Sequence, residues 1–271
     1  MSPALRRRAV DRLVKRGYSK SRACRVCGIS RASSRRKPVE RNPELLAEVL
    51  RLAHLHPRFG FRRIHHLLPG VNIKAVHRIW KQEGLRLRTR KRRKILRTKC
   101  TLPQLTAPNQ SWCLDFCHER LQNGRCVRIL SVLDCFTREN LLLKAAGSFP
   151  ASEVSRELEW LFLVYGKPER IISDNGPEFR AMKLPTGIER AFIQPGKPWQ
   201  NGYVESFFSR LRDEVLNCEL FQRGSDLQER LNEYNEFYND ERPHLGLGGK
   251  TPRAFKQQHQ EQQLEEKILT L

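Results

Sequence analysis

Apolar residues recur at two different spacings along the chain, and each spacing predicts a different kind of element. Over residues 43–83 they return every three or four positions, as in amphipathic helices. Later in the chain they form short runs separated by turn residues, as in strands. The runs predict strands at 111–117, 126–133, 140–145, 169–174 and 191–194, and a helix at 152–165. Three antiparallel strands, followed by helices that alternate with parallel strands, indicate an α/β domain.

The stretch 195–214 combines a rigid turn with an amphipathic helix. It opens with Pro-Gly-Lys-Pro, and no proline follows over about four helical turns. One face is apolar and predicts a buried stripe made of Val204, Phe207, Phe208 and Leu211. The neighbouring face carries Asn201, Glu205, Ser209 and Arg212 at steps of three and four. A carboxylate beside the apolar stripe is unusual for a core helix, and the alternative is an ordinary solvated edge.

Two further acids interrupt apolar segments. Asp115 lies within the run 111–116, and Asp174 ends the run 169–174 before a Gly-Pro turn. An acid within a strand is disfavoured by propensity and costly to bury without a partner. Asp115, Asp174 and Glu205 would repel one another if the fold brought them together, unless a cation lay among them. Carboxylate ligands suit Mg²⁺ or Mn²⁺.

Positive charge is concentrated in the first third of the chain. The net charge is +22, and residues 1–100 hold 30 Lys and Arg against 5 Asp and Glu, whereas residues 101–271 hold 21 against 24. This asymmetry favours nucleic acid as the partner of the N-terminal part. A membrane surface is the competing partner, but the basic helices lack a broad apolar face, and no apolar run is long enough to span a bilayer.

Residues 1–40 form a basic segment in which helices are expected at 4–17, 19–27 and 30–37. The arrangement is similar to a helix-turn-helix unit whose last helix presents Arg31, Arg35 and Arg36 to DNA. A basic helical hairpin that contacts only phosphates fits the spacing equally well.

Residues 41–87 form a second helix-turn-helix-like unit. Its last helix, at 73–83, carries Lys74, Arg78 and Lys81 on the polar side and is expected to contact DNA. The linker 88–108 is a run of positive charge that is expected to follow a phosphate backbone. Its candidate DNA contacts are Arg90, Lys91, Arg92 and Arg93.

The eight cysteines are expected to be reduced thiols in a cytosolic protein, because no secretory signal opens the sequence. Cys24 and Cys27 form a lone C-x-x-C pair, and packing on a small helix is favoured over a zinc site. Cys113 and Cys117 share a strand face with Asp115. They are also assigned to packing, since soft thiolates do not suit a hard metal ion.

Five motifs, in order along the chain, resemble those of one protein family. They are WCLDF (112–116), VLDCFTREN (132–140), SDNGPEF (173–179), QPGKPWQNGYVESFFSRLRDE (194–214) and YNDERPHLGLGGKTP (238–252). Together they are similar to the DDE transposases of bacterial insertion sequences, specifically the downstream-frame (OrfB-type) product of the insertion-sequence-three group, which is related to retroviral integrases. The resemblance implies a ribonuclease-H-like α/β core at 109–245, with a mixed five-stranded sheet, between small all-α helix-turn-helix modules and a tail at 246–271.

The family's catalytic and metal-binding acids map onto Asp115, Asp174 and Glu205. The resemblance implies two Mg²⁺ or Mn²⁺ ions, with Asp115 contacting both. Zinc is not expected, because the lone C-x-x-C pair precedes the histidines, the reverse of the order in the zinc module of retroviral integrases. The implied reaction is cleavage of a DNA strand at the end of an insertion sequence and transfer of its 3′ end to new DNA, without a covalent enzyme intermediate.

Other positions in the motifs have weaker assignments. Arg212 is expected to contact a phosphate near the scissile bond, and Lys197 and Asn201 are further candidates for DNA contact. Asp134 matches a structural acid of the family that holds no metal. The implied partners are double-stranded DNA, further copies of the chain on that DNA, and an upstream-frame (OrfA-type) product, all in the bacterial cytoplasm at the nucleoid.

One departure from the family pattern leaves an alternative open. Between Asp174 and Glu205 lie 30 residues, fewer than is usual for the family. Because the segment 192–201 keeps the motif, the shortening is expected in the helix and loop at 179–190. The alternative to an active enzyme is a catalytically inactive DNA-binding protein that retains the transposase fold.

Overall fold

The computed structural model describes residues 3–35, 42–87, 105–194 and 201–269. The chain divides into two compact units, residues 1–51 and 52–271; the finer division into five segments stays a prediction. Six expected DNA contacts lie outside the described residues: Arg36, Arg90, Lys91, Arg92, Arg93 and Lys197. In the part of the chain that is described, no helix is both long and apolar enough to cross a membrane.

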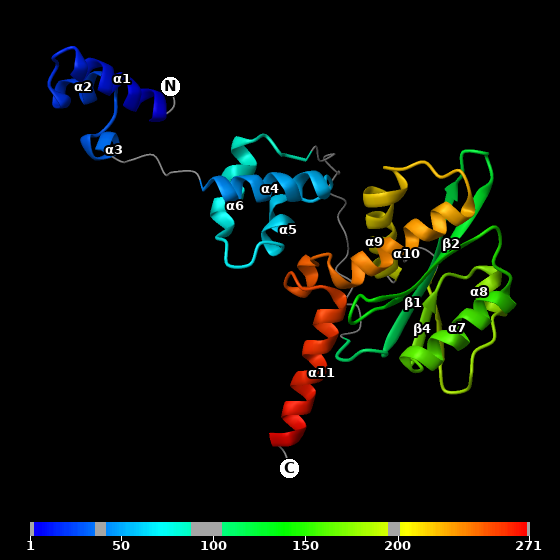
Figure 1. Ribbon diagram of the computed structural model, residues 1–271. Helices are drawn as coiled ribbons and strands as arrows, with labels where there is room; N and C mark the ends of the chain where they lie inside the picture. Colours follow the sequence, from blue (N-terminus) through cyan, green and yellow to red (C-terminus); the bar gives the residue numbers. More distant parts are fainter. Residues whose placement is uncertain (1–2, 36–41, 88–104, 195–200, 270–271) are drawn as a thin grey trace. The chain divides into compact units, whose positions relative to one another are not determined.

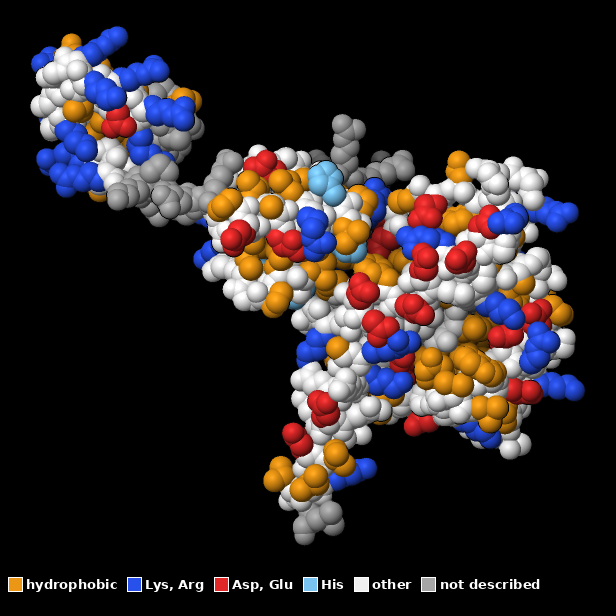
Figure 2. All heavy atoms as spheres, viewed as in Figure 1, with side chains coloured by type: hydrophobic (Ala, Val, Ile, Leu, Met, Phe, Trp, Pro, Cys, Tyr) orange, Lys and Arg blue, Asp and Glu red, His pale blue; other side chains and the backbone are white. Residues whose placement is uncertain are grey.

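The first unit contains three short helices and the start of a fourth. They are α1 (Pro3–Lys15), α2 (Lys20–Val26), α3 (Arg31–Arg35) and α4 (Pro43–Leu55). Ser19 caps α2 by accepting a hydrogen bond from the backbone N–H of Arg22. Cys24 is buried with Val10 and Ala23, and Cys27 packs against this cluster. The C-x-x-C pair therefore contributes to a small core, while Lys and Arg side chains cover the visible face of the unit (Figure 2).

Two more helices precede the sheet in the second unit, α5 (Phe61–His66) and α6 (Ile73–Gln82), and they pack against each other. Asn72 caps α6, where its side chain accepts a hydrogen bond of 2.8 Å from the backbone N–H of Lys74. The apolar stripe of α6 is buried, and it consists of Val76, Ile79 and Trp80. The basic side of α6 is thereby left at the surface.

A mixed five-stranded sheet forms the centre of the second unit, in the order β3-β2-β1-β4-β5. The strands are β1 (Ser111–Arg120), β2 (Cys126–Asp134), β3 (Asn140–Ala146), β4 (Arg170–Ser173) and β5 (Glu189–Phe192). The first three pair antiparallel, and β4 and β5 add in parallel. All five predicted strands are present. The last begins at Glu189 rather than Ala191, because the backbone N–H of Glu189 already donates to the carbonyl of Glu169.

Helices cover both faces of this sheet (Figure 1). One face carries α7 (Ala151–Tyr165) and α8 (Pro177–Ala181); the other carries α9 (Gly202–Leu211), the π-helical turn η2 (Arg212–Leu216) and α10 (Gly224–Asp240). A short turn, η3 (Leu245–Leu247), and α11 (Pro252–Leu269) end the described chain. Alternate residues of β1 enter the two cores, since Trp112 and Leu114 pack toward α7 and Cys113 and Cys117 pack toward α9.

The loss of residues between Asp174 and Glu205 stays a prediction for the segment 179–190, which spans most of the connection from β4 to β5. The helix that joins β4 to β5, α8, has five residues, and both flanking strands keep a regular parallel register. Phe179 of α8 is nevertheless fully buried, where it stacks on Phe116. The short helix still closes the core, and the sheet that carries the acids is intact.

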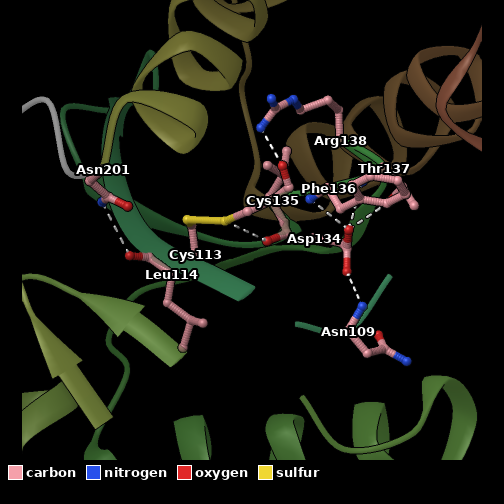
Figure 3. The surroundings of a disulfide bond; sticks show 10 residues. Asn109, Cys113, Leu114, Asp134, Cys135, Phe136, Thr137, Arg138 and Asn201 are labelled. Carbon is pink, nitrogen blue, oxygen red and sulfur yellow. Dashed lines mark hydrogen bonds between the residues drawn. A yellow bond between two sulfur atoms is a disulfide. The ribbon is translucent and has the colours of Figure 1, made fainter. Parts of the chain in front are cut away.

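Asp134 ends β2 and organises the turn that leads to β3. Its carboxylate is 2% exposed and accepts four hydrogen bonds: from the backbone N–H of Asn109, Phe136 and Thr137 and from the Thr137 hydroxyl, at 2.7 to 3.0 Å (Figure 3). The structure supports the expected structural role, because these donors surround the carboxylate.

We expect the substitution Asp134→Asn to lower the free energy of unfolding by about 2–3 kcal/mol. The amide would lose the charge-assisted hydrogen bonds and would turn an N–H group toward backbone donors. Thr137→Val removes one of the four hydrogen bonds and should cost about 1 kcal/mol. Urea denaturation of both variants measures the difference, and equal losses would contradict this ranking.

A buried ionic cluster joins α5 to the helices on the second face of the sheet. Glu214, in η2, accepts two hydrogen bonds from Arg242, of 2.8 and 2.6 Å, and one of 3.2 Å from the hydroxyl of Tyr234. Arg63 of α5 lies 3.8 Å from the same carboxylate. The side chains of Glu214 and Arg242 are only 8% and 3% exposed. One carboxylate therefore compensates two guanidinium groups in the interior.

His244 is half-buried beside this cluster and remains neutral. Its Nε2 lies 3.2 Å from the carbonyl of Tyr238 and donates to it, and its ring packs edge-on against the Tyr238 ring. Burial lowers the pKa of His244 to about 3, and the nearby charge of Arg242 adds to this effect.

This depressed pKa predicts that His244 contributes stability above about pH 6.5, the unfolded-state pKa, and that this contribution is lost as pH falls from 6.5 toward 3. Only the unfolded chain takes up the proton in that window, so the loss should approach about 1.4 kcal/mol per pH unit. We therefore expect the stability difference between wild type and His244→Gln to shrink as pH falls below 6.5, as measured by urea denaturation at several pH values. A difference that stays constant with pH would contradict the prediction.

The expectation of reduced thiols is wrong for one pair. Cys113 of β1 and Cys135, next to Asp134, form a disulfide with a Cα–Cα distance of 6.4 Å (Figure 3). The strand register explains their proximity, because Cys113 pairs with Leu133, two residues before Cys135. Five other cysteines within the described ranges are free thiols: Cys24, Cys27, Cys117, Cys126 and Cys218.

Candidate active site

Asp115 lies in the middle of β1, on the face of the sheet covered by α9 and α10. Its neighbours on that face, Cys113 and Cys117, are buried in the core beneath those helices. The Asp115 side chain is half-buried, and one carboxylate oxygen accepts a hydrogen bond of 2.8 Å from the backbone N–H of Phe116. Because β1 pairs with β2 from Trp112 to Arg120, with Asp115 opposite Ser131, this carboxylate stands on a rigid base.

Asp174 directly follows β4, and the strand register brings it beside Asp115. The parallel pairing joins Cys113 to Ile172, and the two acids come two residues later on their respective strands. Asp174 is exposed, and its Oδ1 accepts a hydrogen bond of 2.9 Å from the backbone N–H of Gly176. A methyl group added at Gly176 would lie 2.9 Å from that oxygen, so a larger residue would push the Asp174 carboxylate out of this position. The support that Gly176 gives to Asp174 is not among the sequence predictions. The Gly-Pro turn after Asp174 is the signal that could have indicated it.

Glu205 is exposed in the first turns of α9, and two contacts fix its position along β1. Before it, the Asn201 side chain donates to the carbonyl of Leu114 at 3.4 Å; after it, Arg212 donates to the carbonyl of His118 at 3.1 Å. The predicted stripe is buried beneath the helix: Val204, Phe207, Phe208 and Leu211. Glu205 therefore lies over the part of β1 that holds Asp115, on the same side of the sheet.

The electrostatics of Asp115 show that the three acids share one neighbourhood. Burial raises the pKa of Asp115 to about 6 despite the hydrogen bond from Phe116, and the negative charges of Asp174 and Glu205 add to the rise. Among the residues that the structure describes, no three His, Cys, Asp or Glu side chains are grouped closely enough to hold a metal ion. Mutual repulsion favours this separation, and two of the acids turn to backbone N–H groups instead.

The basic residues expected at DNA occupy exposed positions wherever the structure describes them. Lys74, Arg78 and Lys81 lie along one side of α6, and Arg31 and Arg35 lie on α3. Their contact with DNA stays a prediction.

The two expected DNA contacts on α9 and η2 differ in burial. Arg212 is exposed, although its guanidinium group also donates to β1. Asn201 is 2% exposed. Direct contact of Asn201 with DNA is therefore wrong for this structure, because its side chain is enclosed between α9 and β1 (Figure 3).

Comparison with known proteins decides the family. Two models of the integrase core domain match residues 106–198 and 186–252. The insertion element IS476 uncharacterized 39.2 kDa protein of Xanthomonas euvesicatoria is 36% identical over 278 residues, which cover 97% of this chain and 80% of the relative. The transposase InsD for insertion element IS2A/D/F/H/I/K of Escherichia coli is 26% identical over 290 residues, or 91% of this chain and 93% of InsD. The chain belongs to the insertion-sequence-three family of transposases.

The family confirms the resemblance indicated by the five motifs, and the transposase has the expected mixed sheet of an integrase core. Among solved structures, the transposase is similar to the HTLV-2 integrase catalytic core domain in complex with magnesium. The TM-score is 0.43 and the identity 19%, over 55% of the transposase and 97% of that chain. All three acids fall within the matched integrase-core regions.

Proposed function

We propose that the transposase uses Asp115, Asp174 and Glu205 to bind divalent metal ions and to cleave and join DNA strands at the ends of an insertion sequence. The observation that carries this proposal is geometric: the strand register sets Asp174 beside Asp115, and the docking of α9 along β1 sets Glu205 over the same stretch. The three come from a strand, a loop after a neighbouring strand and a helix, so the fold brings them to one region of the sheet from distant parts of the sequence.

The residues present fit a hard divalent cation such as Mg²⁺ or Mn²⁺. The donor set consists of carboxylates, and the excess negative charge that raises the pKa of Asp115 is what a cation would neutralise. When bound, two such ions would activate the attacking oxygen and stabilise the leaving oxygen of a phosphodiester.

The chain's own residues divide the remaining tasks. Asp115 offers a fixed ligand, since β1 pairs with β2 along the stretch that holds it, and Asp174 and Glu205 are exposed and free to turn toward it. Gly176 lets the loop backbone support Asp174. The exposed guanidinium group of Arg212, about two turns beyond Glu205, would bind a phosphate oxygen and orient the strand.

Double-stranded DNA is the proposed partner, held by the exposed basic residues of α3 and α6. A second copy of the transposase is also proposed, because α7 exposes an apolar row of Trp160, Leu163 and Val164, which are 53%, 87% and 53% exposed. Figure 2 shows apolar side chains gathered over this helix. An apolar row of this kind often marks an interaction surface.

The proposal predicts that Glu205→Gln abolishes strand cleavage. The purified transposase is incubated with a labelled duplex carrying the terminal inverted repeat, with Mg²⁺ or with EDTA. Wild type should cleave only with metal, because a carboxylate is needed to hold the ion, and the amide of Gln is a poor ligand. Glu229→Gln, the same change at an exposed glutamate of α10, is the matched control and should cleave like wild type.

Two outcomes would overturn the proposal. Equal cleavage by wild type and Glu205→Gln would remove Glu205 from the site. Salt-sensitive DNA binding by wild type with no cleavage in either metal would instead identify a DNA-binding protein that keeps the fold without the reaction.

A further inference from the structure

Arg138, in the turn between β2 and β3, has an unusual backbone conformation. Its φ is 64°, in the left-handed region that residues with a side chain seldom adopt. Its N–H donates to the carbonyl of Asp134 at 2.9 Å, within the turn that the Asp134 carboxylate holds in place. Glycine would adopt this conformation without strain, so the presence of arginine here indicates that its side chain has a function.

The Arg138 side chain reaches across to α9. Its guanidinium carbon lies 3.3 Å from the centre of the Tyr203 ring, and Nη1 donates to the carbonyl of Cys135 (Figure 3). Both Arg138 and Tyr203 are half-buried. A cation held by a backbone carbonyl against an aromatic face, partly shielded from water, is a favourable geometry for cation–π attraction.

Tyr203 lies in the first turn of α9, two residues before Glu205. The other described attachment of this turn, from Asn201 to the carbonyl of Leu114, is long at 3.4 Å. The Asn201 Oδ1 is buried and finds no hydrogen-bond partner among the residues described. Among the described residues, the hydrogen bond from Asn201 holds the start of α9 weakly, and the Arg138–Tyr203 stack is a second, closer polar attachment.

We propose that Arg138 is a positioning residue for Glu205. By clamping Tyr203, it fixes the first turn of α9 at the distance from β1 at which Glu205 can join Asp115 on a divalent ion. This inference rests on the proposed role of Glu205 as a metal ligand. Glycine would relieve the backbone strain in the β2–β3 turn, but it has no side chain that could contact α9. Arginine is strained at this position and supplies the cation that contacts Tyr203.

The variant Arg138→Gly distinguishes a positioning role of Arg138 from a purely structural role in the turn. If Arg138 only filled the turn, glycine would relieve the strain and leave metal binding unchanged. If Arg138 positions Glu205, the variant should fold normally but bind metal more weakly. Equilibrium binding of Mn²⁺, followed by the electron paramagnetic resonance signal of the free ion, measures this without relying on activity.

We expect Arg138→Gly and Tyr203→Leu each to weaken Mn²⁺ binding by about tenfold, the size of one partly buried cation–π contact. The double variant should be no weaker than either single variant, because both break the same contact. Tyr203→Phe keeps the aromatic face and should restore the affinity lost in Tyr203→Leu. Arg125→Gly, which removes an exposed arginine from the β1–β2 turn, is the control for net charge.

Unchanged Mn²⁺ affinity in folded Arg138→Gly and Tyr203→Leu would overturn the inference, while metal-dependent cleavage by wild type would still support the proposed function. Wild type that binds no Mn²⁺ would overturn both. If Arg138→Gly fails to fold, the comparison of Tyr203→Leu with Tyr203→Phe decides, since neither changes the turn.

Discussion

The variant Asp115→Asn is expected to be more stable than wild type in metal-free buffer and to lose strand cleavage by about a thousandfold or more. The loss of activity follows from the removal of the ligand on the most rigid element of the site, where metal ions contribute several kcal/mol. The gain in stability follows from the half-buried carboxylate, whose pKa of about 6 records the cost of keeping it charged near Asp174 and Glu205.

The sign of this effect can be checked through pH. The folded-state pKa of Asp115 is raised, so the folded chain holds the proton more tightly than the unfolded chain does. Its contribution is therefore favourable at low pH and is lost as pH rises from about 4 to about 6. Asn imitates the protonated form, and above pH 6 we expect a gain on the order of 1–3 kcal/mol.

Thermal and urea denaturation with and without Mg²⁺ measure both halves of the prediction. Mg²⁺ should stabilise wild type and leave Asp115→Asn unchanged. Asp226→Asn is the matched control. Asp226 is half-buried, like Asp115, but it is paired with Arg223, which lowers its pKa, so its removal should not stabilise the protein. A metal-free Asp115→Asn that is less stable than wild type would contradict the prediction.

The second large effect is expected at the buried ionic cluster. Glu214→Gln should lower the free energy of unfolding by about 3–5 kcal/mol, because it leaves Arg242 and Arg63 in the interior without a compensating charge. Burial and the charge of Arg242 already lower the pKa of Arg63 to about 10. Loss of the carboxylate makes this position still less favourable for a cation, and α5 should loosen from the helices that cover the sheet.

The control for this variant is Glu219→Gln. Glu219 accepts a hydrogen bond of 2.8 Å from Arg230 at the surface, and its side chain is 39% exposed. The same chemical change there should cost no more than about 1 kcal/mol. Urea denaturation followed by tryptophan fluorescence compares the two, and a similar cost at both sites would show that burial of the Glu214 cluster has little energetic effect.

The sequence pattern is sufficient for the strands and for the faces of the elements. Period-two and helical spacings report burial directly, so they predict β1 and α9 together with their buried faces. The metal-binding role of the three acids stays a prediction. Their shared neighbourhood follows from the register of β1 with β4 and from the docking of α9.

Long-range pairings were beyond the sequence. Nothing in the spacing of Cys113 and Cys135 indicates that the strands bring them into contact, nor that Glu214 and Arg242 form one ionic cluster. Asn201 was misplaced because a polar residue at the start of a helix is usually solvated, whereas here it is enclosed against β1. These outcomes depend on distances between elements, which a one-dimensional pattern does not contain.

The order of the elements along the chain determines which functional residues a truncated chain would contain. The basic helices come first, whereas Glu205 arrives only on α9, and α10 must still pack over the same face of the sheet. A polypeptide released early from the ribosome would carry most of the positive charge but no complete set of acids. If the basic helices bind DNA as proposed, such fragments would occupy it without cleaving it and would compete with the protein that carries all three acids.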